Sequence, residues 1–312
     1  MEFIRLGGRY FIYPLAALYY LLRLRNKYDV IIDAGNGIPF FTPLYIRNIP
    51  ILLLIHHVHQ EIFFTQLKFP FSWIARTLEA KVMPPVYRNI PIVCVSKSTK
   101  KDIMKYKIKR KNDIYIIKNG IDTTKYFPVK NMKKKYITYL GRLRKYKSID
   151  TFLRAIPLLL DEYRDMKFLV AGHGDDLTRL KKIAEKLNIS NKVKFTGKVS
   201  DKKKIDLIRK SHMLVNPSQI EGWGITVLEA NACQVPVIGA DSNGLREAIK
   251  NGRTGLLFKH GDYRDLADKS IKLLREKRLL TKYSINSYNY AKLFSTEKSA
   301  EQFIRLFKSI RK

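Results

Sequence analysis

Residues 221–229 read Glu-Gly-Trp-Gly-Ile-Thr-Val-Leu-Glu, and they connect a predicted strand to a predicted helix. The strand is expected at residues 213–216, the helix at residues 226–233, and a second strand at residues 235–239. A strand, a crossover helix and a parallel strand form the repeating unit of parallel sheets. Ligands of open parallel sheets bind beyond the carboxyl ends of the strands, so this loop is the first candidate for a functional site.

Apolar runs followed by helical patterns recur on both sides of this unit. The runs are continuously apolar rather than alternating, which is typical of strands that are covered on both faces. Further strands are predicted at residues 136–140, 167–171 and 193–195, and in the first half of the chain at residues 29–33, 51–55, 91–95 and 114–117. This alternation predicts an α/β protein with two doubly wound, Rossmann-like domains that face a cleft.

Residues 119–135 separate the two halves, because they contain a glycine, a proline and a lysine run without apolar periodicity. We interpret this segment as a linker between domains. The predicted domains are residues 1–128, completed by a C-terminal helix at about residues 290–312, and residues 129–289. With four strand candidates, the N-terminal domain is expected to be short and incomplete.

The composition excludes several classes of protein. Apolar residues make up 46% of the 312 residues, which is too many for a disordered chain, and two cysteines cannot build a disulfide scaffold. No apolar run reaches the ~20 residues that a membrane-spanning helix needs, so we expect a protein that is soluble or peripheral at the inner membrane face. The two cysteines stand beside small apolar residues, and such buried, reduced thiols fit the cytoplasm. The formal net charge of +33 favours an anionic partner, namely a nucleic acid, an acidic membrane surface or a phosphorylated substrate.

Two loops that follow strands have residues suited to a phosphate or a nucleotide. Gly141 permits a tight turn, after which Arg142 and Lys147 can converge on a phosphate; the alternative is a solvated basic loop. Gly172 and Gly174 are separated by one residue between a strand and a helix. This pattern either lets a nucleotide approach the backbone closely or forms an ordinary tight turn.

The loop at residues 221–229 combines glycines with two acidic residues. Backbone N–H groups at the start of a helix attract anions, and glycines leave them accessible. An acidic residue such as Glu221 is suited to the hydroxyl groups of a sugar, and an exposed loop carboxylate is the alternative. Glu229 also has a structural alternative, because Thr226 and Glu229 have the spacing of a capping box.

Three histidines, His56, His57 and His59, follow the second predicted strand. At the carboxyl end of a strand, a histidine can hydrogen-bond a ligand or transfer a proton, and a purely structural role is the alternative. A metal site is disfavoured, because a single glutamate is the only further ligand nearby. Asn36 lies in the loop after the preceding strand and could line the same cleft.

Together these segments resemble the family-4 glycosyltransferases, which are retaining enzymes with the GT-B fold and are also called glycosyl transferases group 1. The resemblance covers most of the chain and includes two glutamates separated by seven residues, Glu221 and Glu229. The matching segments are residues 95–98, 119–122, 141–147, 171–174, 221–230, 236–239 and 252–257.

Four residues match catalytic positions of this family. Arg142 and Lys147 match the pair that holds the donor diphosphate, and Glu221 matches the glutamate beside the donor sugar. His56 matches a histidine of the cleft, a role that either of the two other histidines of this loop could also hold. The resemblance therefore implies that these four side chains carry the chemistry.

Other matching residues line the donor and acceptor sides. Glu229 matches the glutamate that binds the ribose of the nucleotide. The remaining donor-side residues are Gly141, Gly172, Gly174, Val199, Trp223, Gly224 and Ile225, and the acceptor-side residues are Asn36, His57 and His59.

The implied reaction moves a hexosyl group from a nucleotide-diphosphate sugar to a hydroxyl of a glycan or lipid-linked acceptor, with retention of the anomeric configuration. Cationic side chains stabilise the departing diphosphate, so neither a cofactor nor a metal ion is expected. The alternatives are an inactive or partner-dependent relative that binds nucleotide sugars, and a basic nucleic-acid-binding protein, although no specific nucleic acid is expected. Family members usually begin with a strand and a glycine-rich loop, so the first part of the N-terminal domain is expected to be absent.

Overall fold

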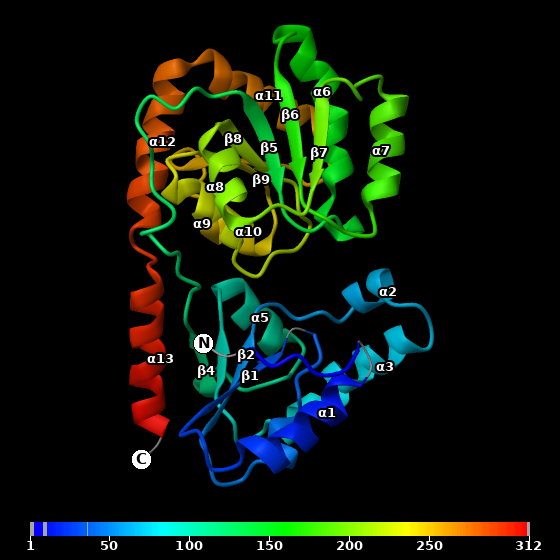
Figure 1. The fold of residues 1–312 in the computed structure, drawn as a ribbon, viewed down its shortest axis with the longest axis vertical. Helices are drawn as coiled ribbons and strands as arrows, with labels where there is room; N and C mark the ends of the chain where they lie inside the picture. Colours follow the sequence, from blue (N-terminus) through cyan, green and yellow to red (C-terminus); the bar gives the residue numbers. More distant parts are fainter. Residues whose placement is uncertain (1–2, 9–10, 36, 311–312) are drawn as a thin grey trace. The chain divides into compact units, whose positions relative to one another are not determined.

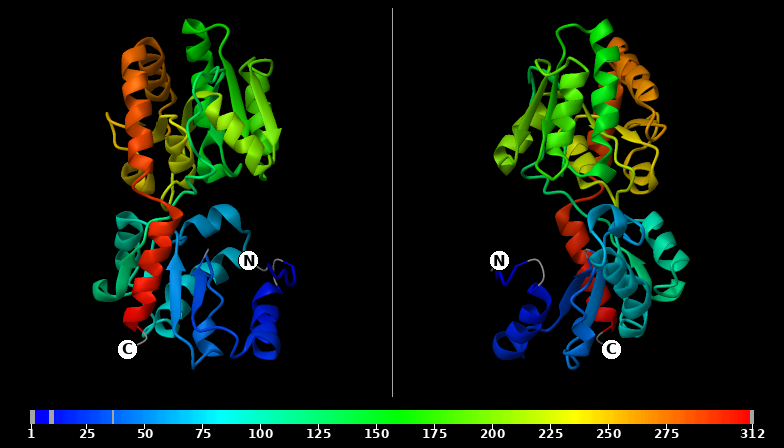
Figure 2. Two further views of the ribbon diagram at one scale, coloured as in Figure 1. Left: turned by 60° about the vertical axis from the view of Figure 1, so that its left-hand side comes forward. Right: turned by 90° about the vertical axis from the view of Figure 1, so that its right-hand side faces the viewer.

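The computed structural model describes residues 3–8, 11–35 and 37–310. Contacts divide the chain into two units, one made of Met1–Lys118 with Ala300–Lys312 and the other of Asn119–Ser299. Each unit contains one parallel sheet with helices on both faces (Figures 1 and 2). The predicted α/β architecture with two parallel sheets is therefore confirmed.

The boundaries between the two units lie at different residues from the predicted boundaries. The chain enters the second unit at Asn119 and leaves it at Ser299, in each case roughly ten residues from the predicted boundary. A backbone hydrogen bond gives the reason, because Ile121 N–H donates to Phe294 O at 2.9 Å. This bond attaches the segment that was expected to be a linker to the second unit.

The first unit is built on a four-stranded sheet in the order β1-β2-β3-β4, with every pair parallel. The strands are β1 Ile31–Gly35, β2 Ile51–Ile55, β3 Ile92–Cys94 and β4 Ile114–Ile116. The α-helices are α1 Ile12–Tyr19, α2 Ile62–Gln66, α3 Phe71–Thr77, α4 Met83–Val86, α5 Lys97–Lys105 and α13 Thr296–Ile310, of which the last enters this unit at Ala300. Short π-helices lie at η1 Tyr20–Leu24 and η3 Leu78–Val82, and 3-10 turns at η2 Thr42–Leu44 and η4 Lys111–Asp113. β1 lies two residues later than predicted, because it pairs in register with β2 from Ile31 to Gly35.

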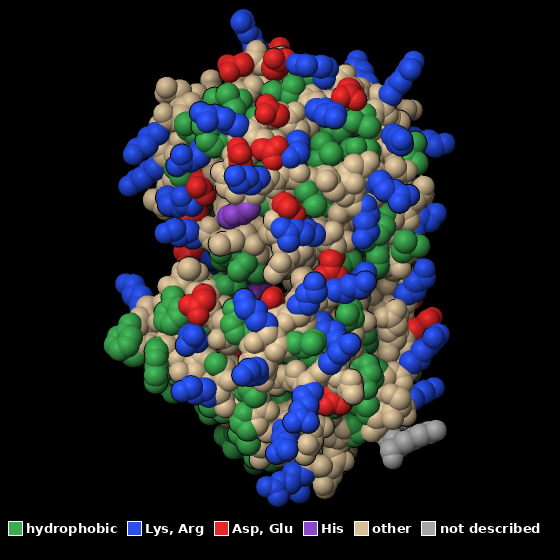
Figure 3. Space-filling model, turned by 180° about the vertical axis from the view of Figure 1, so that it is seen from behind, with side chains coloured by type: hydrophobic (Ala, Val, Ile, Leu, Met, Phe, Trp, Pro, Cys, Tyr) green, Lys and Arg blue, Asp and Glu red, His purple; other side chains and the backbone are tan. Residues whose placement is uncertain are grey.

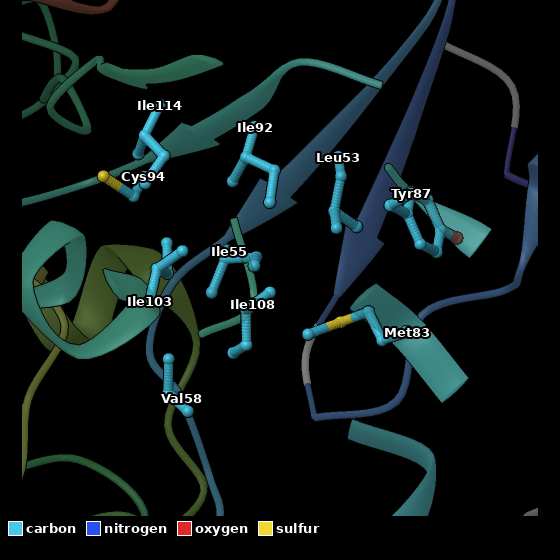
Figure 4. Packing of buried hydrophobic residues seen from close by; sticks show 10 residues of the cluster. All are labelled: Leu53, Ile55, Val58, Met83, Tyr87, Ile92, Cys94, Ile103, Ile108 and Ile114. Carbon is cyan, nitrogen blue, oxygen red and sulfur yellow. The ribbon is translucent and has the colours of Figure 1, made fainter. Parts of the chain in front are cut away.

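Two clusters of buried apolar side chains cover the two faces of this sheet. The cluster in Figure 4 joins Leu53 and Ile92 of the strands to Met83 of α4 and Ile103 of α5. On the other face, α13 packs through Leu306 and the partly buried side chains around it. Successive strand residues point to opposite faces, so the continuously apolar strands fill both clusters.

The second unit is built on a six-stranded parallel sheet in the order β10-β9-β8-β5-β6-β7. The strands are β5 Tyr136–Leu140, β6 Lys167–Ala171, β7 Val193–Gly197, β8 Ser211–Asn216, β9 Val237–Ala240 and β10 Gly255–Phe258. The helices are α6 Ile149–Glu162, α7 Leu177–Lys186, α8 Asp201–Arg209, α9 Ile225–Ala232, α10 Asn243–Ala248, α11 Tyr263–Arg275 and α12 Lys277–Ala291, with a short turn at η5 Lys145–Lys147. The order of strands reverses between β5 and β8, and open α/β sheets bind their ligands at such a switch point.

The positive charge is not concentrated in one region of the face that Figure 3 shows. Lys and Arg side chains are spread over this face rather than gathered in one patch (Figure 3). In the described part of the chain, none of the helices has the length and apolar character required to cross a membrane.

Candidate functional site

The switch point of the second unit brings the loop after β5 next to the loop after β8. The two strands pair in parallel, and between the loops Gln219 N–H donates to Tyr146 O at 3.0 Å. Gly141 opens the first loop with a φ of +154°, a backbone conformation that favours glycine. The two loops together carry Arg142, Lys147 and Glu221, three of the four predicted catalytic residues.

Lys147 and Glu221 form an ion pair between these loops. Lys147 Nζ lies 2.6 Å from Glu221 Oε1, and Asn216 Nδ2 at the end of β8 lies 3.5 Å from the same oxygen. Only 13% of the Lys147 side chain and 18% of the Glu221 side chain are exposed, so each charge compensates the other where solvent access is reduced. Glu221 is therefore not a solvated loop carboxylate.

Arg142 lies in the same loop but has different surroundings. Its carbonyl oxygen accepts a hydrogen bond from Tyr139 OH at 2.8 Å, which holds the start of the loop. Its guanidinium is exposed and makes no hydrogen bond or ion pair with any residue that the structure describes. Of the two predicted phosphate-binding cations, Lys147 already has an acidic partner and Arg142 does not.

Gly172 and Gly174 have a packing role that does not depend on a ligand. A Cβ on Gly172 would lie 1.8 Å from Gly141 O, and a Cβ on Gly174 would lie 2.0 Å from Leu143 O. The backbones are also bonded, since Leu143 N–H donates to His173 O at 2.9 Å. Both glycines are thus required for the loops after β5 and β6 to pack against each other.

The start of α9 follows a buried tryptophan, Trp223. Gly224 is the N-cap of the helix with a φ of +73°, and Ile225, its first residue, is half-exposed. Trp223 is 2% exposed, and its ring packs against Phe294 in an edge-to-face arrangement with centroids 5.3 Å apart. Val199, the other predicted apolar donor-side residue, lies in the loop that connects β7 to α8 and is half-buried.

Glu229 on α9 binds two side chains that the sequence analysis does not single out. Its Oε1 accepts hydrogen bonds from Tyr126 OH at 2.9 Å and from Lys204 Nζ at 2.8 Å. The capping-box alternative with Thr226 is wrong, because Gly224 is the N-cap and no side chain caps the helix. No local pattern could have found this cluster, since Tyr126 and Glu229 are 103 residues apart.

The protonation states within this cluster suit its hydrogen bonds. Burial raises the pKa of Tyr126, so its hydroxyl keeps the proton that it donates. Burial alone would lower the pKa of Lys204, but the hydrogen bonds to Glu229 and Tyr126 raise it overall. Lys204 therefore stays charged beside the carboxylate.

The three candidate histidines of the first unit directly follow β2. His56 is half-buried, its carbonyl oxygen accepts from Thr99 Oγ1 at 3.1 Å, and burial lowers its pKa. His59 is 7% exposed, and its ring stacks on those of His57 and Phe63 with centroids 4.1 and 5.1 Å away. Burial also lowers the pKa of His59, so both rings are neutral at pH 7.

Glu79, which the sequence analysis does not identify, anchors this histidine loop. Its carboxylate accepts from the backbone N–H groups of His59 and Gln60 at 2.8 and 2.7 Å and from Gln60 Nε2 at 2.8 Å. Burial raises the pKa of Glu79, while these three hydrogen bonds act in the opposite direction. Asn36, the remaining acceptor-side candidate, lies outside the described residues.

The histidines do not form part of a recognisable metal centre. Among the residues that the structure describes, no three His, Cys, Asp or Glu side chains are grouped so that they could hold a metal ion. The rings of His57 and His59 stack at an interplanar angle of 30° instead.

Comparison with known proteins assigns the chain to a family. A model of the family described as glycosyl transferases group 1 matches residues 121–290, which is more than half of the chain. The chain belongs to this family. A second model, glycosyltransferase family 4, matches residues 2–125 of this group 1 glycosyl transferase.

The group 1 glycosyl transferase is similar to curated proteins over part of their length. It is 29% identical to an uncharacterized glycosyltransferase of Methanocaldococcus jannaschii over 231 residues, which are 70% of this chain and 58% of the relative. It is 31% identical to N-acetyl-alpha-D-glucosaminyl L-malate synthase of Bacillus anthracis over 182 residues, which are 55% of this chain and 47% of the relative. The chain thus spans about half the length of these relatives.

Solved structures show the fold of the group 1 glycosyl transferase. Anabaena HepE in complex with UDP and glucose matches with a TM-score of 0.80 at 18% identity, over 97% of this chain and 83% of HepE. Similarity at this level of identity reports on the fold alone. It confirms the GT-B architecture of two parallel-sheet domains that the motifs imply.

Proposed function

We propose that this group 1 glycosyl transferase moves a hexosyl group from a nucleotide-diphosphate sugar to an acceptor hydroxyl, with retention of the anomeric configuration. The observation that carries the proposal is the largely buried Lys147–Glu221 ion pair at the switch point, with Arg142 in the same loop and free of an acidic partner among the described residues. HepE, which shares the fold, has been solved with UDP and glucose, and this favours UDP as the nucleotide to test first.

The proposed chemistry depends on the charge of the leaving group. Breaking the bond between the sugar and the diphosphate builds negative charge on the phosphate oxygens. Arg142 and Lys147 stabilise this charge, and the backbone N–H groups at the start of α9 add a positive potential. Glu221, bonded to Lys147, accepts hydrogen bonds from hydroxyl groups of the donor sugar.

In this proposal Arg142 and Lys147 neutralise the charge that a divalent ion would otherwise neutralise, so the transfer needs neither a metal nor a cofactor. Glu229 binds the ribose of the nucleotide. His56 is the residue proposed to orient the acceptor hydroxyl, because a neutral imidazole can both donate and accept a hydrogen bond. The acceptor itself is proposed to be a glycan or a lipid-linked sugar.

A peripheral position at an anionic membrane is proposed from a group of exposed side chains in the first unit. We call Phe64, Phe69, Phe71 and Trp73 the aromatic cluster; these residues are 48%, 83%, 48% and 57% exposed. They belong to α2, to α3 and to the loop between them. Exposed aromatic rings on a chain with a net charge of +33 suit the interface of an anionic bilayer.

Calorimetric titration of the purified chain with UDP, GDP and ADP tests the donor site. We expect one nucleotide to bind, and Arg142→Ala to weaken its binding by roughly tenfold or more, because a charge-assisted contact to phosphate is lost. The matched control is Arg154→Ala, which removes an exposed arginine of α6 and leaves binding unchanged.

Transfer is then measured with the corresponding nucleotide sugars, with and without EDTA, and the anomeric configuration of the product is read by NMR. An inverted product, or a rate abolished by EDTA, would contradict the mechanism. A folded chain that binds no nucleotide would favour an inactive or partner-dependent relative. Binding to duplex DNA with a steep salt dependence would favour the nucleic-acid alternative.

A further inference from the structure

Two side chains from separate parts of the second unit converge on one carboxylate oxygen of a third. Tyr126 belongs to the segment before β5, Lys204 to α8 and Glu229 to α9. The hydroxyl of Tyr126 and the ammonium of Lys204 both bond to Glu229 Oε1, at 2.9 and 2.8 Å. The side chain of Glu229 is 9% exposed, and that of Lys204 is 22% exposed.

The second oxygen of Glu229 is left without a bond. Oε2 has no hydrogen bond from any residue in the described part of the chain, and it is not among the fully enclosed polar atoms that lack a partner. A buried carboxylate is costly unless its charge is compensated, and Lys204 supplies that compensation through Oε1. Oε2 therefore remains an acceptor that solvent or a ligand can reach.

Tyr126 is held firmly enough to orient its partner. Its N–H donates to Asp122 O at 2.9 Å, and the Asp122 side chain caps the same turn through Thr124 N–H at 3.0 Å. Arg209 clamps the next residue by donating to Phe127 O at 3.0 Å. These contacts fix the tyrosine through its backbone, and the hydroxyl of its buried ring bonds to Glu229.

We propose that Tyr126 and Lys204 are positioning residues, which hold Glu229 by Oε1 so that Oε2 accepts a hydrogen bond from a ribose hydroxyl of the donor nucleotide. This inference rests on the proposed function, since it assumes that a nucleotide occupies the site. It adds two residues to the proposed donor site that belong to none of the matching segments. It also implies that the hydroxyl of Tyr126 increases the affinity only for nucleotides that carry the ribose hydroxyl bound by Glu229 Oε2.

The test compares Tyr126→Phe with the parent chain by calorimetry, using UDP, GDP and ADP and then the 2′-deoxy and 3′-deoxy forms of the nucleotide that binds. We expect Tyr126→Phe to weaken binding of the ribonucleotide by roughly two- to tenfold. For one of the two deoxy forms, the parent and the variant should bind equally. Lys204→Met should follow the same pattern with a larger loss, about tenfold or more, because a charged partner is removed.

The matched control is Tyr290→Phe, which removes another bonded tyrosine hydroxyl of the same unit, the one that donates to Glu247 O at 3.0 Å. This control should not change the preference for ribose over deoxyribose. If Tyr126→Phe binds all forms as the parent does, or weakens all of them equally, the positioning role is wrong and the proposed function stands. If the folded parent binds no nucleotide, the proposed function itself fails, and the inference fails with it.

Discussion

Single side chains are expected to set the order in which the proposed site at the switch point engages a diphosphate. Lys147 is paired with Glu221 at 2.6 Å, whereas Arg142 has no acidic partner among the described residues. A free cation costs less to engage than one that must share an existing ion pair. An incoming diphosphate is therefore expected to bind Arg142 first. Lys147 is then expected to donate hydrogen bonds both to the phosphate and to Glu221.

Replacing Lys147 by Met should abolish most transfer. The variant keeps the length of the side chain but removes the positive charge, and the loss of one such preorganised contact typically costs about 100- to 1000-fold in rate. Glu221→Gln should also lose most activity, because the amide cannot hold Lys147 as a carboxylate does. The measurement is the rate of transfer with each nucleotide sugar, together with circular dichroism to verify folding.

Lys269→Met serves as the control for this pair. It removes a lysine from an ion pair with Asp265, which is also partly buried but belongs to α11. This variant should retain the parent rate. Parent rates in both Lys147→Met and Glu221→Gln would mean that the catalytic site lies elsewhere.

At the level of elements, the proposed donor side depends on the contact between the loops after β5 and β6. Gly172 N–H donates to Gly197 O at 3.0 Å and Gly141 N–H donates to Ala171 O at 3.0 Å, so the three strand ends are joined by backbone alone. Such a contact leaves no room for a Cβ at Gly172. The glycines thus shape the loop that carries Arg142 before any ligand is bound.

Gly172→Ala should destabilise the second unit by about 2–4 kcal/mol, because the new methyl group overlaps a carbonyl oxygen and the backbone conformation is unfavourable for alanine. A Cβ there would lie 1.8 Å from Gly141 O, at a φ of +145°. Gly261→Ala is the matched control, since Gly261 has a φ of +82° but no atom within 4 Å of the added Cβ. The control should cost only about 1 kcal/mol. Urea denaturation measures the free energy of unfolding of both variants. Equal losses would show that the backbone conformation, rather than the contact with Gly141 O, causes the destabilisation.

For the molecule as a whole, charge and exposed aromatic rings are proposed to act together at a membrane. Lys and Arg exceed Asp and Glu by 33, and Lys and Arg side chains are spread over the face in Figure 3. Long-range attraction would bring the chain to an anionic surface, and the aromatic cluster would then anchor it. Electrostatic attraction is screened by salt, whereas insertion of the rings is not.

Vesicle sedimentation tests this arrangement. We expect the chain to bind vesicles that contain anionic phospholipid at low salt, and the double variant Phe69→Ser with Trp73→Ser to bind several-fold more weakly, because two exposed rings are removed. Ile285→Ser, at an exposed apolar residue of α12, is the control and should bind as the parent does. Equal binding by the double variant and the parent, or by neutral and anionic vesicles, would exclude the proposed mode.

Much of the fold was accessible from the residues alone, because the patterns that define it are local. β5 and β6 lie at the predicted residues, since a continuous apolar run between polar turns is visible in any five-residue window. β10, with four residues, was missed, and the boundary near Asn119 was misplaced because its partner Phe294 lies far away in the chain. The family was likewise accessible, since it rests on the order and spacing of short motifs.

The partner of each charged side chain, in contrast, depended on the folded chain. Motif spacing brought Glu221 and Glu229 to attention, but it did not reveal that one binds Lys147 and the other binds Tyr126 and Lys204. Glu79, which anchors the histidine loop, carries no pattern at all. These contacts form because the order of strands in the sheet brings distant loops together, and that order is a property of the packed molecule rather than of any local stretch of residues.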